Sequence, residues 1–375
     1  MMERRKNLND KFGFVDSMKI KDFIDYEQPN EYIVESDRYN SKYSTPVLTA
    51  GQSFILGYTN ESKGIYKKGP CIIFDDFTTS VHYVDFPFKV KSSAMKILTT
   101  KSNTDLKYCY YLLLSLSKMP PNHKRQWIST TSEKNHVLPS MDRQISIVKQ
   151  LDLISDTIVN YTNQIENLDN LVKARFIEMF GDININNKNW HTEHLGKLCN
   201  IVRGSSPRPI EKYLGGDIPW IKIGDATDED NIYLNSTKEH IIREGVNKSR
   251  FVKKGSLIFA NCGVSLGFAR IISFDGCIHD GWLALENIDY RLNKEFLLLS
   301  LNQLTDHFRI IAPSGTQPNL NIAIMQNFMQ VIPPMELQET FVSFRRHVDK
   351  SREAVKKSLE KTQQLYDSLM QEYFG

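Results

Sequence analysis

The sequence lacks the short motifs that carry nucleotide or cofactor chemistry. It has no G-x-x-x-x-G-K-[S/T] loop, so ATP hydrolysis has no visible site, and no G-x-G-x-x-G that follows a strand. It also lacks the Asn/Asp-Pro-Pro-aromatic tetrapeptide of amino-methyltransferases, because the prolines of "MPPN" at residues 119–122 have the wrong neighbours. These absences argue against an enzyme whose active site lies in this chain.

Cysteines and long apolar runs are also scarce. The five cysteines are scattered and form no C-x-x-C pair, so neither a disulfide framework nor a zinc ribbon is indicated, and a reducing cytoplasm is expected. The longest apolar run, residues 108–117, is about half the roughly 20 residues that a membrane span needs, and it predicts a buried helix. No apolar region follows the basic start "MMERRKNLND", so no signal peptide is expected.

Charge of one sign is not in large excess. The net charge of +3 is too weak to establish nucleic-acid binding, so the local distribution of basic residues has to decide that question. A hydrophobic content of 41% and a charged content of 24% are typical of a soluble globular protein. A length of 375 residues favours two domains over a single core.

Two clusters of chemically active side chains remain, and neither predicts a catalytic or metal site. "HTEH" at residues 191–194 is followed by Cys199, but no second cluster completes a zinc site, which favours a structural role. "DGCIHDGW" at residues 275–282 suggests a nuclease or a Cys–His pair. Neighbours on a strand point to opposite faces, however, and a nucleophile pair needs an orienting group.

What the sequence does have is a repeat. "VLPSMDRQ" at residues 137–144 returns as "VIPPMELQ" at residues 331–338, and without a gap the two copies continue to "EMFG" and "EYFG". The identical pairs include Val137/Val331, Pro139/Pro333, Met141/Met335, Gln144/Gln338, Glu166/Glu360, Leu171/Leu365, Phe180/Phe374 and Gly181/Gly375. A gapless repeat of this length indicates duplicated architecture.

Each copy predicts a strand followed by a long helix. Neither Gly nor Pro interrupts the stretch between Pro139 and Gly181, or that between Pro334 and Gly375, and Gly is a typical helix end. About 39 residues at 1.5 Å each would span roughly 58 Å, more than a small domain. The apolar residues recur every 3.5 positions, which is the pattern of a coiled-coil seam. The seam residues are Ile154, Ile158, Tyr161, Ile165, Leu168 and Val172 in the first helix, and Val348, Val355, Leu359, Tyr366, Met370 and Tyr373 in the second, interrupted by Arg352 and Thr362.

Charge favours an antiparallel pairing of these two helices. Residues 344–361 hold seven Lys/Arg against three Asp/Glu, whereas residues 150–167 hold three acidic residues and no basic one. In an antiparallel pair the two middles would meet, and opposite charges would set the orientation more than the stability. Two alternatives stay open: amphipathic helices that each lie on their own domain, and two solvated charged faces.

The regions before the two helices echo one another in fragments such as "YKKGPCIIF" and "VKKGSLIFA", and "YLLLSL" and "FLLLSL", but otherwise diverge. Both contain polar, basic loops, and Lys and Arg suit phosphates while Asn, Gln, Arg and Ser suit base edges. The alternative for any single loop is a solvated surface. The candidate DNA-binding residues are Tyr58, Asn60, Lys63, Tyr66, Lys67, Lys68, Lys124 and Arg125 in the first region, and Arg203, Ser205, Ser206, Arg208, Asn261, Ser265, Arg270, Thr316 and Gln317 in the second.

This layout resembles the DNA-specificity (S) subunit of type I restriction–modification systems. The resemblance covers essentially the whole chain and is carried by "PVLTAGQSFILGYTNESKGIY", by "IPWIKIGD" with "SGTQPNLN", and by the pair "LPSMDRQ…EMFGD" and "IPPMELQ…EYFG". It implies two globular α/β (α+β) target-recognition domains, separated by two long antiparallel coiled-coil helices in a pseudo-two-fold repeat. The domains are then expected at residues 1–136 and 182–330, and the helical spacers at residues 137–181 and 331–375.

The resemblance also implies a function. Each domain would recognise one half of a split double-stranded DNA site, and the helices would fix the gap between the halves and hold two methyltransferase subunits. The subunit itself would be cytoplasmic, non-catalytic and without cofactor or metal. S-adenosylmethionine for adenine methylation would lie in the methyltransferase, and ATP and magnesium in endonuclease subunits that join for restriction. A structural coiled-coil adaptor and a two-domain DNA-binding protein that acts alone stay open as alternatives.

Overall fold

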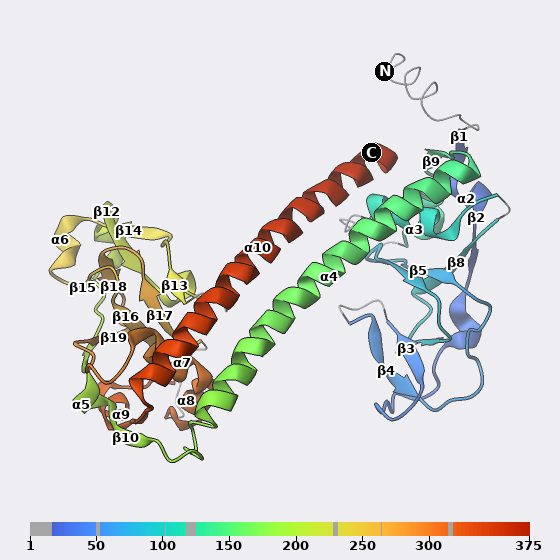
Figure 1. Ribbon diagram of the computed structural model, residues 1–375. Helices are drawn as coiled ribbons and strands as arrows, with labels where there is room; N and C mark the ends of the chain where they lie inside the picture. The colour runs from blue at the N-terminus through green and yellow to red at the C-terminus, as the bar shows by residue number, and fades with distance from the viewer. Residues whose placement is uncertain are drawn as a thin grey trace. The chain divides into compact units, whose positions relative to one another are not determined.

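The computed structural model describes residues 17–49, 53–101, 103–117, 125–227, 232–263, 265–313 and 318–375. The chain divides into two compact units. Unit 1 comprises Met1–Asn163 with Val355–Gly375, and unit 2 comprises Gln164–Ala354. Each unit therefore contains one globular part and one half of each long helix (Figure 1). The fold class predicted from the sequence, two mixed α/β parts with two long helices, is confirmed, whereas the exact domain boundaries stay a prediction.

The globular part of unit 1 precedes the first long helix, α4 (Met141–Phe180). Its strands are β1 (Ser17–Lys19), β2 (Ile24–Glu27), β3 (Thr45–Leu48), β4 (Ile55–Thr59), β5 (Cys71–Asp75), β6 (Val81–Val84), β7 (Lys89–Val90), β8 (Met95–Thr100) and β9 (Asn135–Val137). Its helices are α2 (Ile20–Phe23), η1 (Pro29–Tyr32), α3 (Leu106–Leu116) and η2 (Trp127–Thr131).

The globular part of unit 2 lies between α4 and the second long helix, α10 (Met335–Phe374). Its strands are β10 (His191–His194), β11 (Asn200–Arg203), β12 (Leu214–Ile221), β13 (Tyr233–Leu234), β14 (Glu239–Ile241), β15 (Arg250–Val252), β16 (Leu257–Ala260), β17 (Ala269–Ile272), β18 (Gly276–Ile278), β19 (Trp282–Glu286) and β20 (Met329–Ile332). Its helices are α5 (Leu195–Leu198), η3 (Ile210–Lys212), η4 (Ile223–Asp225), α6 (Arg243–Val246), α7 (Lys294–Gln303), α8 (Thr305–Ile311) and α9 (Ile322–Asn327).

The two globular parts share one sheet topology. In unit 1 a sheet runs in the order β2-β8-β5-β6, and in unit 2 the corresponding sheet runs β11-β19-β16-β17, with β13 added at the edge. A second sheet pairs β3 antiparallel with β4 and parallel with β7. In unit 2, β12 likewise pairs antiparallel with β14 and parallel with β18. The fragments that echo one another in the sequence therefore occupy equivalent positions, since "YKKGPCIIF" leads into β5 and "VKKGSLIFA" into β16.

A short antiparallel strand pair joins the beginning and the end of each globular part. In unit 1, β1 pairs with β9, and in unit 2, β10 pairs with β20. In both units the first strand continues through one helical turn into the edge strand of the main sheet, by way of α2 in unit 1 and α5 in unit 2. The segments "MKIKDFIDY" (residues 18–26) and "HLGKLCNIV" (residues 194–202), which match only loosely in sequence, therefore have equivalent structures.

The leucine-rich fragments form equivalent helices, α3 and α7. The residue before each helix caps it, because the Asp105 carboxylate accepts the N–H of Tyr108 at 2.8 Å and the Asn293 side chain accepts the N–H of Glu295 at 2.9 Å. Both helices lie against the main sheet, and leucines of each are buried in the core, among them Leu112 and Leu113 of α3 and Leu297 and Leu298 of α7. The buried helix predicted at residues 108–117 is confirmed as α3.

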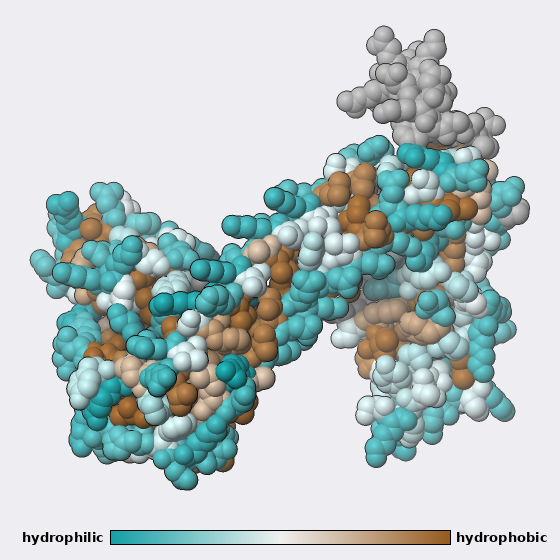
Figure 2. All heavy atoms as spheres, viewed as in Figure 1, coloured by the Kyte–Doolittle hydropathy of each residue, from teal (hydrophilic) through white to brown (hydrophobic). Residues whose placement is uncertain are grey.

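Within each unit the two long helices are antiparallel. In unit 1, near the start of α4, Gln150 accepts a hydrogen bond from Tyr373 near the end of α10 at 2.8 Å. In unit 2, near the end of α4, the Phe176 ring packs 5.3 Å from that of Phe341 near the start of α10. The predicted seam is confirmed, because its residues are buried or half-buried while Figure 2 shows hydrophilic atoms (teal) beside the apolar ones (brown) along the helices.

The interruption of the seam at Arg352 has a local explanation. The guanidinium is buried and donates to Asp169 of α4 at 2.8 Å and to Asp349 at 3.0 Å. Opposite charges do therefore meet between the helices in unit 2. Asp152, one of the acidic residues expected to face α10, instead accepts hydrogen bonds from Lys107 and Tyr111 of α3, both at 2.7 Å.

The repeated glutamines bind each long helix to its globular part. Gln144 accepts the backbone N–H of Asp105 at 2.8 Å and donates to the carbonyl oxygen of Pro139 at 2.8 Å. Gln338 makes the same two bonds, accepting the N–H of Asn293 at 2.8 Å and donating to the carbonyl of Pro333 at 2.7 Å. Both side chains are fully buried. The repeat thus preserves a joint between the helix, the cap of α3 or α7, and the strand that precedes the helix.

Replacing these glutamines is expected to destabilise one unit at a time. Gln144→Leu removes the partners of two main-chain groups, and each buried group left unsatisfied costs about 1–3 kcal/mol. Hydrogen exchange followed by mass spectrometry should show faster exchange in unit 1 for Gln144→Leu and in unit 2 for Gln338→Leu. Gln164→Leu, at an exposed position of α4, is the control and should change neither. If Gln144→Leu and Gln338→Leu each speeded exchange equally in both units, the idea that each glutamine stabilises its own unit would be wrong.

Candidate nucleic-acid interface

In unit 2 the turn between β18 and β19 connects the candidate loops. The N–H groups of Gly204 and Ser205 donate to carbonyl oxygens at residues 282 and 278, at 2.8 and 3.1 Å. Asn261 donates its N–H to the Gly281 carbonyl at 3.0 Å. Gly204 is required here, because a Cβ at this position would collide with the His279 carbonyl oxygen. Loops that lie about 75 and about 20 positions from the turn in sequence therefore meet at residues 278–282, which we call the hub.

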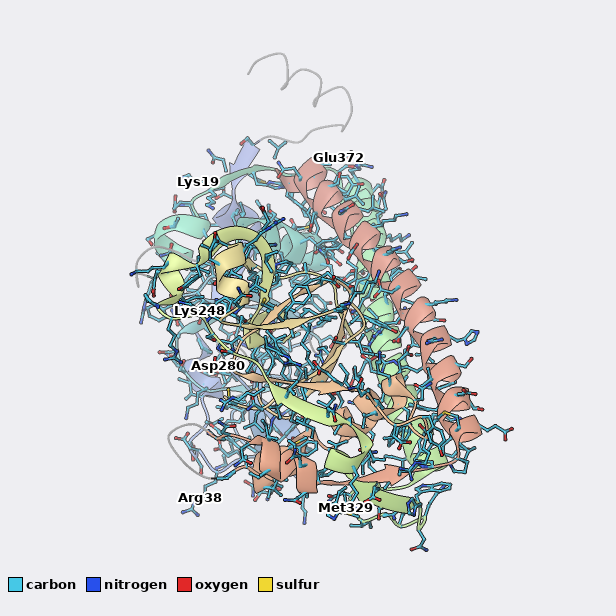
Figure 3. All side chains as sticks on the ribbon, turned by 90° about the vertical axis from the view of Figure 1, so that its left-hand side faces the viewer. Lys19, Arg38, Lys248, Asp280, Met329 and Glu372 are labelled. Atoms are coloured by element: carbon cyan, nitrogen blue, oxygen red, sulfur yellow. The ribbon has the colours of Figure 1, made fainter. Side chains whose placement is uncertain are left out.

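The Asp280 side chain and main chain hold the loop of residues 203–208. The carboxylate accepts a hydrogen bond from the Ser206 hydroxyl at 2.7 Å and lies 3.6 Å from the guanidinium of Arg208. The main-chain carbonyl of Asp280 accepts the Nε–H of Arg203 at 2.9 Å. Ser205 is fixed from the other side, since its hydroxyl donates to the carbonyl of Lys248 at 2.9 Å. Figure 3 faces this unit and labels Asp280 and Lys248.

His279 supports the same arrangement as a neutral side chain. The N–H of Gly281 donates to its Nδ1 at 2.8 Å, so the proton lies on Nε2, which is 3.1 Å from the Asp280 carboxylate. Burial lowers the pKa of His279 and so favours the neutral form. Burial alone would raise the pKa of Asp280, but the hydrogen bond from Ser206 and the nearby charges outweigh it, and the pKa is lowered. The carboxylate is therefore ionised at neutral pH.

The cysteine of this segment is not arranged as a nucleophile. Cys277 is fully buried on β18, and burial raises the pKa of its thiol. Reactive cysteines have a lowered pKa and an electropositive, partly exposed surrounding. The segment "DGCIHDGW" therefore organises loops through hydrogen bonds.

Three candidate DNA-binding residues are buried, and the prediction of direct DNA contact is wrong for them. Tyr66 packs in the core of unit 1 between the rings of Tyr32 and Phe88. Asn261 is fully buried and links two candidate loops, donating from its side chain to Asn319 at 3.1 Å. Arg270 is buried on β17, where its guanidinium stacks on the Phe268 ring at 4.7 Å. A side chain enclosed by its own fold cannot reach a duplex at the surface.

Most of the other candidates in unit 2 lie on the surface. Arg203, Ser205 and Arg208 are exposed, while Ser206 and Ser265 are partly exposed. Thr316 and Gln317 lie outside the described residues, as does Lys124 of unit 1. Four of the candidates therefore lie in one short segment, residues 203–208, which begins at the end of β11.

In unit 1 three of the candidates line a hollow of about 730 Å³. Tyr58, Asn60 and Lys67 line it together with Pro46 and Phe86. Lys67 is exposed and takes part in no ion pair among the residues that the structure describes, so its charge is available to a ligand. The hollow therefore combines an aromatic ring, an amide and a cation at one surface.

The remaining basic candidates of unit 1 differ in exposure and in the contacts that they already make. Lys68 donates to Glu27 at 2.9 Å, and this hydrogen bond raises the pKa of the lysine. Lys63 is exposed, and its carbonyl oxygen accepts a bond from the buried Lys89 at 2.8 Å. Arg125 is exposed directly after a stretch that is not described.

Neither a metal site nor a membrane span is found in the parts of the chain that the structure describes. In these parts, no group of three or more His, Cys, Asp and Glu side chains could hold a metal ion. The two histidines of "HTEH" lie on β10, which pairs with β20. Across the same parts, no helix has the length and apolar character needed to cross a bilayer.

A protein-family model matches most of unit 2, including the hub. Residues 187–363, which contain the hub and most of unit 2, match the model described as "Type I restriction modification DNA specificity domain". The match covers a little under half of the chain. The resemblance to type I specificity subunits predicted from the sequence is confirmed.

Curated relatives of this chain are described as specificity subunits of type I restriction enzymes. The chain is 38% identical over 245 residues to the specificity subunit of the type I restriction enzyme EcoR124I/EcoR124II of Escherichia coli, covering 62% of this chain and 60% of the relative. It is 22% identical over 210 residues to the MjaIX specificity subunit of Methanocaldococcus jannaschii, covering 54% and 48%. The chain thus spans about half to three fifths of the length of these relatives.

Solved structures agree with the fold over nearly the full chain. The S subunit of a type I restriction–modification system from M. genitalium superposes with a TM-score of 0.63 at 17% identity, covering 98% of both chains. A structure described under complex assembly and conformational transition of the type I R-M system gives a TM-score of 0.56 at 16% identity, covering 94% of this chain and 97% of the other. At these identities the likeness shows the fold alone.

The sequence did not predict that His279 and Asp280 would hold neighbouring loops together through hydrogen bonds. Their segment stood out for its chemistry and was weighed as a catalytic or metal site, although a turn with two glycines and a carboxylate also suits the binding of loops. A signal was present in the glycines on both sides, at residues 276 and 281. No pattern in the sequence, however, indicated which distant loop the carboxylate would meet.

Proposed function

We propose that this chain is the DNA-specificity subunit of a type I restriction–modification complex and that it recognises a bipartite DNA site. The observation that carries the proposal is the 38% identity to a curated specificity subunit over 245 residues. The family match over residues 187–363 adds that unit 2 contains a specificity domain. In this proposal each unit recognises one half-site.

The duplication supports recognition of two different half-sites. The sheet order, the terminal strand pair and the glutamine joint are alike in the two units. The surfaces that carry the candidate contacts differ, because unit 1 has the hollow at Tyr58, Asn60 and Lys67, whereas unit 2 has the loop held by Asp280. A shared frame with different surface loops suits two domains that bind different sequences.

The long helices offer equivalent surfaces for two identical partners. Leu171 and Leu365 occupy the same place in the repeat and are 48% and 51% exposed. Glu166 and Glu360 form another identical, exposed pair. Identity at buried positions follows from the shared fold, but identity at exposed positions favours a shared partner. We assign this role to two copies of the methyltransferase subunit, and the helices would also fix the distance between half-sites.

In this proposal the methyltransferase and endonuclease subunits carry out the catalytic reactions of the complex. S-adenosylmethionine would bind to the methyltransferase, whose pocket would take the adenine after it leaves the stack. ATP and magnesium would bind to the endonuclease subunits. The present chain would supply sequence recognition and assembly in the cytoplasm, without catalysis of its own. A coiled-coil adaptor or a DNA-binding protein that acts alone would leave the family match over unit 2 without a reason.

The deciding experiment maps DNA methylation by long-read sequencing in cells that carry this chain with its neighbouring methyltransferase. We expect a split motif with methylated adenine that disappears when this chain is deleted. The methylated motif would give the sequences of both half-sites, and its loss on deletion would show that this chain is required for their recognition. An active methyltransferase that methylates no such motif in the presence of this chain would overturn the proposal and favour the adaptor.

A further inference from the structure

The hub fixes Arg203 in an unusual way for a surface arginine. Arg203 ends β11, which pairs with β19 in the main sheet, so its backbone belongs to a rigid element. Its Nε–H donates to the main-chain carbonyl of Asp280 at 2.9 Å. The side chain is exposed but is anchored at the base of its guanidinium.

This anchor leaves the outer end of the guanidinium free. The two terminal nitrogens, Nη1 and Nη2, make no hydrogen bond or ion pair with the part of the chain that the structure describes. They form a planar pair of donors that points away from the anchored Nε. Guanine presents two acceptors, N7 and O6, on its major-groove edge, and the end of an arginine matches this pair.

Asp280 keeps the arrangement in place, and among the described residues its carboxylate forms no ion pair with Arg203, although the two charges are close enough to attract each other. Its carboxylate accepts the Ser206 hydroxyl at 2.7 Å and faces the Nε2 of His279 at 3.1 Å. These contacts hold the turn whose carbonyl anchors Arg203. Arg208, by contrast, is 83% exposed and is held by a long ion pair of 3.6 Å with the carboxylate, so its side chain is held more loosely and suits a phosphate.

We propose that Arg203 recognises a guanine in the half-site bound by unit 2, and that Asp280 is the positioning residue that fixes the turn and the loop around it. The inference rests on the proposed function and goes beyond it, because it assigns a base and an edge to one side chain. An arginine that is fixed before binding loses little side-chain freedom when it donates two parallel bonds. A loosely held arginine suits a phosphate, which any sequence provides.

The test compares Arg203→Lys with Arg208→Lys in the complex with the methyltransferase. Both variants keep the positive charge, but lysine cannot donate two parallel bonds. Methylation rates would be measured on duplexes that carry each base at every position of the mapped motif. We expect Arg203→Lys to reduce the preference for guanine over adenine at one position of one half-site, by between about 5-fold and about 150-fold. Arg208→Lys should leave the recognised motif as it is.

Asp280 is tested by a pair of variants that separates positioning from folding. Asp280→Ala removes the acceptor of Ser206 and should weaken the same guanine preference, whereas Asp280→Asn keeps an acceptor oxygen and should retain most of it. Amide exchange of β16 and β19 would report the integrity of the fold. A loosened preference with unchanged exchange supports positioning.

The outcomes separate this inference from the proposed function. If the wild-type complex methylates no split motif, the proposed function fails. If it does methylate one but Arg203→Lys leaves every base preference unchanged, or lowers methylation equally at all sequences, the inference is overturned while the proposed function stands. A motif without guanine in either half-site would also overturn it.

Discussion

Lys96→Met is expected to destabilise unit 1 by about 3–5 kcal/mol, the range found when one partner of a buried ion pair is removed. Lys96 on β8 and Asp76 after β5 are both 0% exposed, and the ammonium lies 3.1 Å from the carboxylate. The ammonium also donates to Gln28 at 3.1 Å, and the carboxylate accepts the N–H of Trp127 at 2.8 Å. Methionine fills the space but leaves a buried carboxylate without a countercharge. Urea unfolding monitored by hydrogen exchange, unit by unit, would measure the loss.

A second variant tests whether the uncompensated charge is the cause. Lys96→Met/Asp76→Asn removes both charges, and the amide oxygen of Asn can still accept the N–H of Trp127. It should recover a large part of the stability lost in the single variant. Lys101→Met is the matched surface control, because Lys101 and Asp25 are 40% and 62% exposed and such pairs are worth about 0–1 kcal/mol. A double variant as unstable as the single one would contradict the charge argument.

The frame of this protein was predictable because its signals are local and repeated. The heptad spacing and the absence of Gly and Pro predict two long helices, and the end of α4 is confirmed by Gly181, whose φ of 74° suits a glycine at a helix end. The leucine-rich run predicts α3. Identity between Gln144 and Gln338 indicated that something is shared, but only the structure shows that both glutamines bind a helix cap and a proline carbonyl.

The surface was less predictable, because burial depends on contacts between distant segments. Tyr66, Asn261 and Arg270 lie in polar, glycine-containing stretches, yet each side chain turns into its own fold. The stretch "SAMKILTT" does not indicate that Lys96 is buried, since its countercharge, Asp76, comes from the turn after β5. Asp280 lies 74 positions from Ser206, and no sequence period connects them. Composition indicates which residues suit DNA, whereas the fold decides which of them can reach it.

The interruption of the coiled coil at Arg352 shows how both kinds of information combine. In sequence it is a defect in an apolar seam. In the structure it is a buried cation with carboxylates from both helices, Asp169 and Asp349. A single polar pair in an otherwise apolar seam restricts the register and direction in which two helices can pair. The duplicated helices therefore differ at the position where a symmetric apolar seam would leave several registers of similar stability.

The DNA contacts predicted for the two units lead to the second large effect, which concerns Lys67 and Arg208. Reversing both charges, as Lys67→Glu/Arg208→Glu, should weaken binding of the complex to a duplex carrying its motif by roughly 100-fold at about 0.1 M salt, since like charges brought together at an interface cost several kcal/mol. The slope of log K against log salt concentration should become shallower by about 1 for each phosphate that the protein no longer neutralises. Titration at several salt concentrations would measure both quantities.

Both substitutions are at exposed positions, but they differ in what they remove. Lys67 has no ion pair among the described residues, whereas Arg208→Glu replaces the 3.6 Å contact between Arg208 and Asp280 by a repulsion between two carboxylates. Unchanged amide exchange of β16 and β19 would show that unit 2 still folds in the variant. Lys173→Glu is the matched control, because it reverses the same charge at an exposed position of α4, outside both loops. If Lys173→Glu changes the slope as much as Lys67→Glu does alone, the net charge of the chain governs binding and the assignment of these loops is wrong. If only the loop variants change it, both units contact phosphates, as recognition of a bipartite site requires.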